Sequence, residues 1–385
     1  MGGGNLPESL NAGAEPVTNR PRARDLGIIV GDLLSPGPLN SITDVPRVKV
    51  GMAEKFLGDK IVRAGVTLIG TDDIDTVPLF AGIAVMQGSG ELTGSLFIAE
   101  SGLLTDLVAI TGTTQVGAAH MAMAYREPGA LKLPIVGETF DRMTHPLASC
   151  PIGSADIAAA FADMTSGKLR EGNVGGGAAM VSFGLKGGTG TASRLVPSAR
   201  GNKDFVVGVL VQANHGVPYD LTISGERIGK VLADEGYTAP WFPSHDSGTK
   251  QPKDGDGSII IVIATDAPLL PHQCSAVARR GGVGVSRGGG GTGFFSGDIF
   301  LCFSTAGATH GASNARPRPR EGGRTSVNAE TLDAIFRAAA DATEEAILNA
   351  LFAAEDMEGY TGRKWRGLPV ERVREILKEA GKVPN

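Results

Sequence analysis

The sequence of 385 residues has few cysteines, few aromatic residues and no long apolar segment. Its three cysteines, Cys150, Cys274 and Cys302, have no paired spacing, which argues against a disulfide framework and a zinc site and favours a reducing compartment. The N-terminal stretch lacks the apolar core of a signal peptide, and no run reaches transmembrane length. We therefore expect a cytoplasmic protein that does not contact a membrane.

The sequence also lacks a large excess of positive or negative charge and any cluster of metal-ligand residues. The formal net charge is −5, which leaves no electrostatic footprint for nucleic acid, and the short basic stretch 315–324 is interpreted as a solvated loop. No cluster of Asp, Glu and His has metal-ligand spacing, so we expect no metal. The segments GNVGGG and RGGGGTG contain neither a complete dinucleotide-binding motif nor a P-loop, so no cofactor is expected.

Glycine is abundant instead, with 56 residues scattered along the chain. This number indicates many positions where the backbone turns tightly or approaches another group closely. The first 25 residues are polar and rich in glycine and proline, which predicts a flexible arm, and residues 244–257 predict an exposed linker. Both features would lie outside the packed core.

Apolar patterns predict alternating strands and helices. Strands are expected in residues 66–70, 79–86, 95–98, 177–185, 204–214, 258–265 and 296–305. Helices are expected in residues 154–164, with Ser154 as N-cap, in 271–280, closed by Gly281, and in 328–355. Several strand segments are apolar on both faces, which favours sheets covered by helices on their outer sides.

The junction Gly257–Ser258 places a hydroxyl between the linker and a buried strand. The sequence has no G-x-S-x-G elbow, and its six histidines show no spacing that suggests a catalytic triad. A serine can also be activated by its own α-amine, which has a pKa near ~7.7, if the preceding peptide bond is cut. Taken alone, however, the pattern favours a strand that simply begins after a turn.

Several longer motifs give this junction a context. They are PGPLNSITDVPRVKVG (36–51), EGNVGGGAAM (171–180), GLKGGTGTASR (184–194), LVQANHG (210–216), GDGSIIIVIATDAPLLPHQ (255–273) and SGDIFLCFSTA (296–306). In this order they resemble the DmpA family, which includes L-aminopeptidase/D-esterase enzymes and β-peptidyl aminopeptidases. The resemblance covers the chain from about residue 24 to 365.

The resemblance implies an α/β fold, a four-layer α/β/β/α sandwich of the DmpA and ornithine acetyltransferase type that is similar to Ntn hydrolases. It implies cleavage between Gly257 and Ser258, which yields an α chain (1–257) and a β chain (258–385) within one structural domain. It also implies a homo-oligomer of αβ units, often a tetramer. The expected substrates are short peptides, amides or esters with a free amine.

The same resemblance implies roles for individual residues. Ser258 would be the nucleophile, and the amide of Asn214 would stabilise the oxyanion. Ser296 and Asp298 would assist the nucleophile; residues i and i+2 of a strand share a face, and a strand parallel to 258–265 would bring Ser296 close to Ser258. Glu138 would receive the amino group of the substrate. Locally, "SGD" is a turn motif and Asn214 a turn residue.

Three positions depart from the family pattern. Asp298 replaces the usual Glu and is one methylene shorter, which makes its role less secure. Phe140, at a substrate-binding position, replaces Tyr and lacks its hydroxyl, and Gly112 stands where Asn is common. The latter two changes affect the substrate range more than the chemistry.

Two other functions remain open on sequence grounds. The first is an acyltransferase like the ornithine acetyltransferases, although these usually have Thr as the nucleophile. The second is a non-catalytic binding protein that does not process itself.

Overall fold

The computed structural model describes residues 20–58, 62–126, 133–198, 204–238, 257–306 and 327–384. The basic stretch 315–324, the linker residues 244–256 and the first 19 residues of the expected arm lie outside these ranges. From Arg20 onward the arm is anchored, because the Arg20 guanidinium donates to the carbonyls of Phe352 and Leu368. A short 3₁₀ turn, Ala23–Leu26, follows.

Two sheets form the centre of the molecule. One contains β1 (Val48–Leu57), β2 (Val62–Thr71), β5 (Val108–Gly112) and β6 (Ile135–Thr139), in the order β1-β2-β5-β6. The other has the order β4-β3-β12-β11-β10-β9 and contains β4 (Leu103–Leu104), β3 (Leu79–Gly88), β12 (Gly297–Ser304), β11 (Gly257–Thr265), β10 (Phe205–His215) and β9 (Gly188–Val196).

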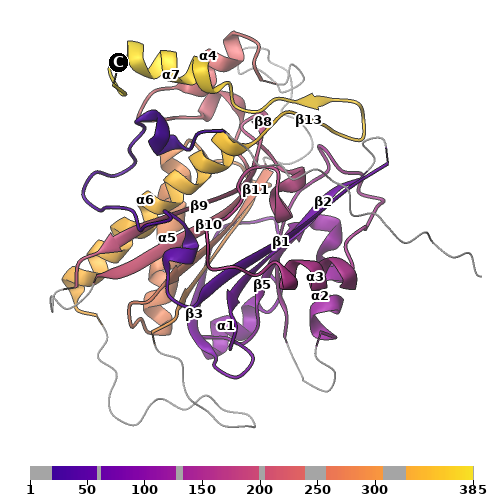
Figure 1. Ribbon diagram of the computed structural model, residues 1–385, viewed down its shortest axis with the longest axis vertical. Helices are drawn as coiled ribbons and strands as arrows, with labels where there is room; N and C mark the ends of the chain where they lie inside the picture. Colours follow the sequence, from indigo (N-terminus) through magenta and orange to yellow (C-terminus); the bar gives the residue numbers. More distant parts are fainter. Residues whose placement is uncertain are drawn as a thin grey trace, which may run out of the picture.

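Helices cover the outer face of each sheet (Figure 1). The six-stranded sheet packs against α5 (Pro271–Arg287) and α6 (Ala329–Ala353), and the four-stranded sheet against α2 (Val116–Ala124) and α3 (Ser154–Ala162). The remaining helices are α1 (Ser95–Ser101), α4 (Ile228–Asp234) and α7 (Val370–Glu379), and short hairpins are formed by β7 (Val181–Ser182) with β8 (Leu185–Lys186) and by β13 (Met357–Glu358) with β14 (Lys364–Trp365). The result is the expected α/β/β/α order of layers.

Strand β11 explains why its sequence is apolar without alternation. Ile259, Ile261 and Ile263 lie in the core between this sheet and α5 and α6, whereas Ile260 and Val262 lie in the core between the two sheets. Because successive side chains point to opposite faces, a strand covered on both faces needs apolar residues at every position. The strand is thereby held firmly behind Ser258.

Four sequence expectations were wrong, three of which concern α1, residues 177–185 and the N-cap of α3. Residues 95–98 form the start of α1, not a strand; Gly94 and Gly102, both at positive φ, bound this short helix. Residues 177–185 form a 3₁₀ turn and a two-residue hairpin strand on each side of a turn. The N-cap of α3 is Gly153, whose N–H donates to the Asp156 carboxylate, so Ser154 is already the first helical residue.

Helix α5 does not end at Gly281 but continues to Arg287. Gly281 faces Ile261 and Phe300 of the sheet, and a Cβ at Gly284 would lie 2.6 Å from the Cβ of Thr343 in α6. These glycines therefore allow close packing of the helix on both neighbours. Tertiary contacts outweigh the low helix propensity of glycine here.

The relation between β11 and β12 is the expected one. The two strands are parallel, with Ser258 opposite Gly297 and Ile259 opposite Asp298, and α5 connects them. On the other side β10 is antiparallel to β11 and pairs Asn214 with Ser258. The starts of β11 and β12 and the end of β10 thus meet at one edge of the sheet.

Candidate active site

Ser258 lies at this edge as the second residue of β11, with 2% of its surface exposed. Its Oγ accepts a hydrogen bond from the N–H of Phe140 at 3.1 Å. Phe140 directly follows β6. This contact therefore connects the C-terminal end of β6, in the four-stranded sheet, to Ser258 in the other sheet. The sequence analysis placed Phe140 at a substrate-binding position and did not indicate this contact of its backbone with Ser258.

Gly257 has a conformation that only glycine adopts readily. Its φ is +85°, and a Cβ at this position would lie 2.0 Å from the carbonyl oxygen of Asn214. Both observations require the absence of a side chain before Ser258. The bond between Gly257 and Ser258 is therefore held in a tightly packed, left-handed turn of backbone at the start of the strand.

The side-chain amide of Asn214 is fixed at both ends. Its Oδ1 accepts from the N–H of Val181 at 2.8 Å, and its Nδ2 donates to the carbonyl of Phe140 at 2.9 Å. These partners determine which end of the amide is nitrogen. Since Nδ2 carries two hydrogens, one remains for an oxyanion near Ser258.

The peptide group that carries the Val181 N–H is held through its Met180 carbonyl by Lys186, a residue that sequence reasoning had missed. Lys186 is fully buried, and its ammonium donates to the carbonyls of Gly177, Met180 and Gly187. Burial lowers the pKa of Lys186 well below its usual value. A lysine in a glycine-rich motif offers no sequence signal for this role, because the three carbonyls converge only in the folded loop.

Ser296 and Asp298 are brought together beside Ser258. Ser296 Oγ donates to Asp298 Oδ1 at 2.5 Å, and both residues adjoin Gly297, the strand partner of Ser258. The shorter Asp side chain therefore reaches Ser296. Burial raises the pKa of Asp298 to about 6, while hydrogen bonds from Ser296 and the Ile259 N–H oppose this shift.

Glu138 lies in β6, two residues before Phe140, and is 5% exposed. Oε1 accepts from the N–H of Glu91 at 3.1 Å, and Oε2 accepts from Thr113 Oγ1. Burial raises the pKa of Glu138 above its usual value, and these two hydrogen bonds oppose that shift. Thr113 and Glu91 carry no motif of their own, and only the folded structure shows that they orient this carboxylate.

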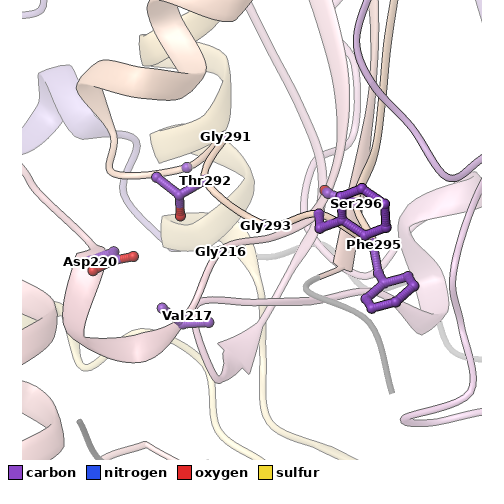
Figure 2. A pocket seen from close by; sticks show the side chains of 10 residues that line it. Gly216, Val217, Asp220, Gly291, Thr292, Gly293, Phe295 and Ser296 are labelled. Atoms are coloured by element: carbon purple, nitrogen blue, oxygen red, sulfur yellow. The ribbon is translucent and has the colours of Figure 1, made fainter. Parts of the chain in front are cut away.

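A cavity of about 350 Å³ adjoins Ser296 (Figure 2). Its lining consists of residues that follow β10, including Val217 and Asp220, and of residues 290–296, which precede β12. Because β11 lies between β10 and β12, the cavity is at the same end of the sheet as Ser258, although no residue of β11 lines it. Phe294 and Phe295 are 83% and 61% exposed at its rim.

His215 is next to Asn214 in sequence but belongs to a different environment. Its ring packs edge-on against Phe183, with 5.1 Å between ring centroids, and burial lowers its pKa to about 4. Among the described histidines, none is hydrogen-bonded to Ser258. The geometry therefore offers a serine with amide donors and a Ser–Asp pair rather than a Ser–His arrangement.

Comparison with known proteins fits this geometry. Residues 40–365 match the model of peptidase family S58. The chain belongs to peptidase family S58. It is 38% identical over 376 aligned residues to the β-peptidyl aminopeptidase BapA of Sphingosinicella xenopeptidilytica, a match that covers 93% of this chain and 91% of that protein.

Solved structures of S58-type enzymes have the same fold. A β-aminopeptidase of Burkholderia sp. superposes with a TM-score of 0.83 and 40% identity, covering 94% of this chain and 100% of that one. The L-aminopeptidase D-Ala-esterase/amidase of Ochrobactrum anthropi, described as a new variant among the Ntn hydrolase fold, gives a TM-score of 0.80 and 37% identity, covering 95% and 100%. The Ntn-like fold expected from the sequence is confirmed.

Family membership also decides between the functions left open by the sequence. The chain is a self-processing serine aminopeptidase, and the family does not favour an acyltransferase or a non-catalytic binding protein. None of the described helices combines the length and apolarity needed to cross a bilayer.

Proposed function

We propose that Ser258 is the nucleophile of this S58 aminopeptidase and that the chain activates itself by cleaving Gly257–Ser258. The observation that carries the proposal is the position of Ser258 Oγ, 3.1 Å from the Phe140 N–H and at the edge where Asn214, Ser296 and Asp298 meet. The cut divides the chain into an α chain, 1–257, and a β chain, 258–385. It also frees the α-amine that acts as the base.

In the catalytic reaction Ser258 Oγ bonds to the carbonyl carbon of the substrate's first residue. The Oγ proton passes to the α-amine of Ser258, and the free N–H of Asn214 Nδ2 stabilises the oxyanion. When the C–N or C–O bond breaks, the leaving group takes that proton. Water then attacks the acyl-enzyme and restores Ser258.

The Ser296–Asp298 pair supports the base. Asp298 Oδ2 is buried and has no hydrogen-bond partner in the uncut chain. A protonated α-amine at Ser258, next to the β12 residues that pair with it, supplies a positive charge for this carboxylate. The pair thus holds the base in place and stabilises its charged form.

Glu138 binds the ammonium of the substrate and thereby favours substrates with a free N-terminus. Its carboxylate is buried, oriented by two donors and two residues from Phe140, whose N–H meets the nucleophile. The cavity beside Ser296 provides space for the rest of the substrate. The substrates are short peptides, amides and esters, and the names of two relatives support β-peptides among them.

We further propose that αβ units assemble into a homo-oligomer, a tetramer, in the cytoplasm. The support for the oligomer is the family resemblance, and the support for the cytoplasm is the unpaired spacing of the three cysteines, which favours a reducing compartment.

A denaturing gel of Ser258→Ala beside wild type tests the proposal. Wild type should yield two bands, of roughly two thirds and one third of the mass, whereas Ser258→Ala should stay whole and show no aminopeptidase activity. Ser304→Ala is the matched control, because Ser304 is also buried but lies at the other end of β12. Cleavage of Ser258→Ala, or an N-terminus of the small band other than Ser258, would refute the assignment.

A further inference from the structure

Asp141 is a buried carboxyl group that the mechanism above does not use. Its side chain is 1% exposed, and neither carboxyl oxygen has a hydrogen-bond partner. Buried polar groups are nearly always hydrogen-bonded, because leaving one unpaired costs on the order of 1–3 kcal/mol. A partner that is absent from the free protein would account for this arrangement.

The carboxyl group lies next to the site where the substrate amine is expected. Gly112 packs against it so closely that a Cβ there would be 2.0 Å from Oδ2. The next residue, Thr113, donates its hydroxyl to Glu138. Consecutive residues of one turn therefore contact both carboxyl groups, and Phe140, which precedes Asp141, contacts Ser258.

Electrostatics also connects the two acids. Burial, together with the negative charge of Glu138, raises the pKa of Asp141 to about 7, while the N–H of its own backbone opposes this shift. The charge of Asp141 in turn adds to the effect of burial in raising the pKa of Cys150. Glu138 and Cys150, the two groups whose pKa values are linked to Asp141, bring no positive charge to it.

We propose that Asp141 is a second carboxylate of the amine subsite and accepts a hydrogen bond from the substrate ammonium. An ammonium has three N–H donors. Because Glu91 and Thr113 each use one acceptor site on the Glu138 oxygens, about two sites remain, so this single carboxylate leaves the cation incompletely bonded. When Asp141 is protonated in the free enzyme, binding releases its proton to the solvent. The inference rests on the proposed role of Glu138.

A pair of esters separates amine binding from the acyl-transfer chemistry. Alanine methyl ester has the amine, and methyl propionate lacks it but has the same ester bond. In processed Asp141→Asn, kcat/KM for alanine methyl ester should fall about 10- to 100-fold, mainly through KM, because a charge-assisted hydrogen bond is lost. The value for methyl propionate should stay within about twofold of wild type.

The pH profile gives a second readout. For wild type, kcat/KM of alanine methyl ester should rise as the pH increases through about 7, as Asp141 loses its proton. Loss of the proton from the Ser258 α-amine, at a pKa near ~7.7, raises kcat/KM in both proteins, so the readout is the difference between their profiles. With alanine methyl ester the component near pH 7 should be absent from Asp141→Asn, and with methyl propionate the two proteins should give the same profile.

Three further variants define the outcome. Glu138→Gln should show the same selective loss. Asp106→Asn should not, although Asp106 is also a buried carboxylate, because it precedes β5 at the other end of the strand from Gly112. Gly112→Ala displaces the Asp141 carboxyl without changing its chemistry and should reproduce the loss, which keeps the proposal testable if Asp141→Asn is not processed.

The possible results distinguish the two proposals. An equal loss for both esters in Asp141→Asn would make Asp141 purely structural and would overturn the inference. A selective loss in Glu138→Gln without one in Asp141→Asn would leave a subsite with one carboxylate. No selectivity in Glu138→Gln would refute the role of Glu138 itself.

Discussion

The two sides of the active site differ in how fully their polar groups are bonded before substrate arrives. On the nucleophile side, Ser258, Asn214 and Ser296 each have a partner within the protein, and Asp298 is bonded through Oδ1 although its Oδ2 has no partner. On the amine side, Glu138 has two donors and Asp141 has none. The nucleophile side is thus preorganised for charge that develops in the reaction, whereas the amine side is completed by the charge of the substrate.

Replacing Gly257 should abolish the activation of the nucleophile side, which is the largest effect expected. In Gly257→Ala the new Cβ would clash with the Asn214 carbonyl, at 2.0 Å, and the positive φ would cost about 1–2 kcal/mol more. We expect the full-length band to persist on a denaturing gel during incubation of the purified protein.

Gly225→Ala is the matched control for this experiment. Gly225 has nearly the same φ, +82°, but no atom lies within 4 Å of its Cβ position. This variant has the backbone cost without the clash and should be processed like wild type. Equal processing of Gly257→Ala would show that the tight junction does not matter for the cut.

Removing the Asn214 amide should weaken catalysis without regard to the amine. In processed Asn214→Ala, kcat should fall about 10²- to 10³-fold because one oxyanion donor is lost. The factor should be the same for alanine methyl ester and methyl propionate, in contrast to the selective loss on the amine side.

Asn173→Ala provides the comparison for this variant. The Asn173 amide also bonds one backbone carbonyl and one N–H, both of Glu355, but on the exposed surface. Its kcat should equal that of wild type. A loss in Asn214→Ala that is confined to the amine ester would move Asn214 to the amine side of the comparison.

The nucleophile side could be predicted from the sequence, because its residues belong to long ordered motifs. The parallel pairing of β11 and β12 followed from two apolar runs around a helix, and it placed Ser296 near Ser258 correctly. The family match carried the residue roles, since "SGD" and "QANHG" alone are turn-like. Asp298 departs from the family pattern by being one methylene shorter than Glu. Its 2.5 Å contact with Ser296 shows that the shorter side chain reaches this serine.

Only one residue of the amine side, Glu138, could be predicted from the sequence. Glu138 came from the family match, but the contacts of Thr113 and Asp141 depend on how the turn after β5 meets the end of β6, which no local pattern encodes. The same limit explains the errors in α1 and α5. A short apolar run such as 95–98 is compatible with a helix or a strand, and a glycine such as Gly281 can end a helix or allow close packing within it. Only tertiary contacts decide which structure forms.

The smallest expected effect is the contribution of Asp141 to the pH dependence of stability. Between about pH 4 and pH 7 the unfolded chain has an ionised Asp141, whereas the folded protein retains the proton, because the folded pKa is about 7 against an ordinary 3.8. Stability is therefore lost as the pH rises through this range, by at most about 1.4 kcal/mol per pH unit. In Asp141→Asn this contribution disappears.

The measurement is the Tm of substrate-free wild type and Asp141→Asn at pH 5, 6, 7 and 8. The curve of the variant should be flatter by a few degrees across the range. Parallel curves would mean that Asp141 ionises alike in the folded and unfolded states and would remove its distinction from the nucleophile side.

The order of strands in the larger sheet has a consequence for the life of the enzyme after the proposed cut. Strands β11 and β12 come from the β chain and lie between β10 and β3, which both come from the α chain. Before the cut, the chain folds as one molecule. Afterwards, a denatured enzyme would have to find its other half by diffusion, so refolding would depend on protein concentration. After activation, the lifetime of the folded enzyme would therefore depend on its rate of unfolding rather than on reversible refolding.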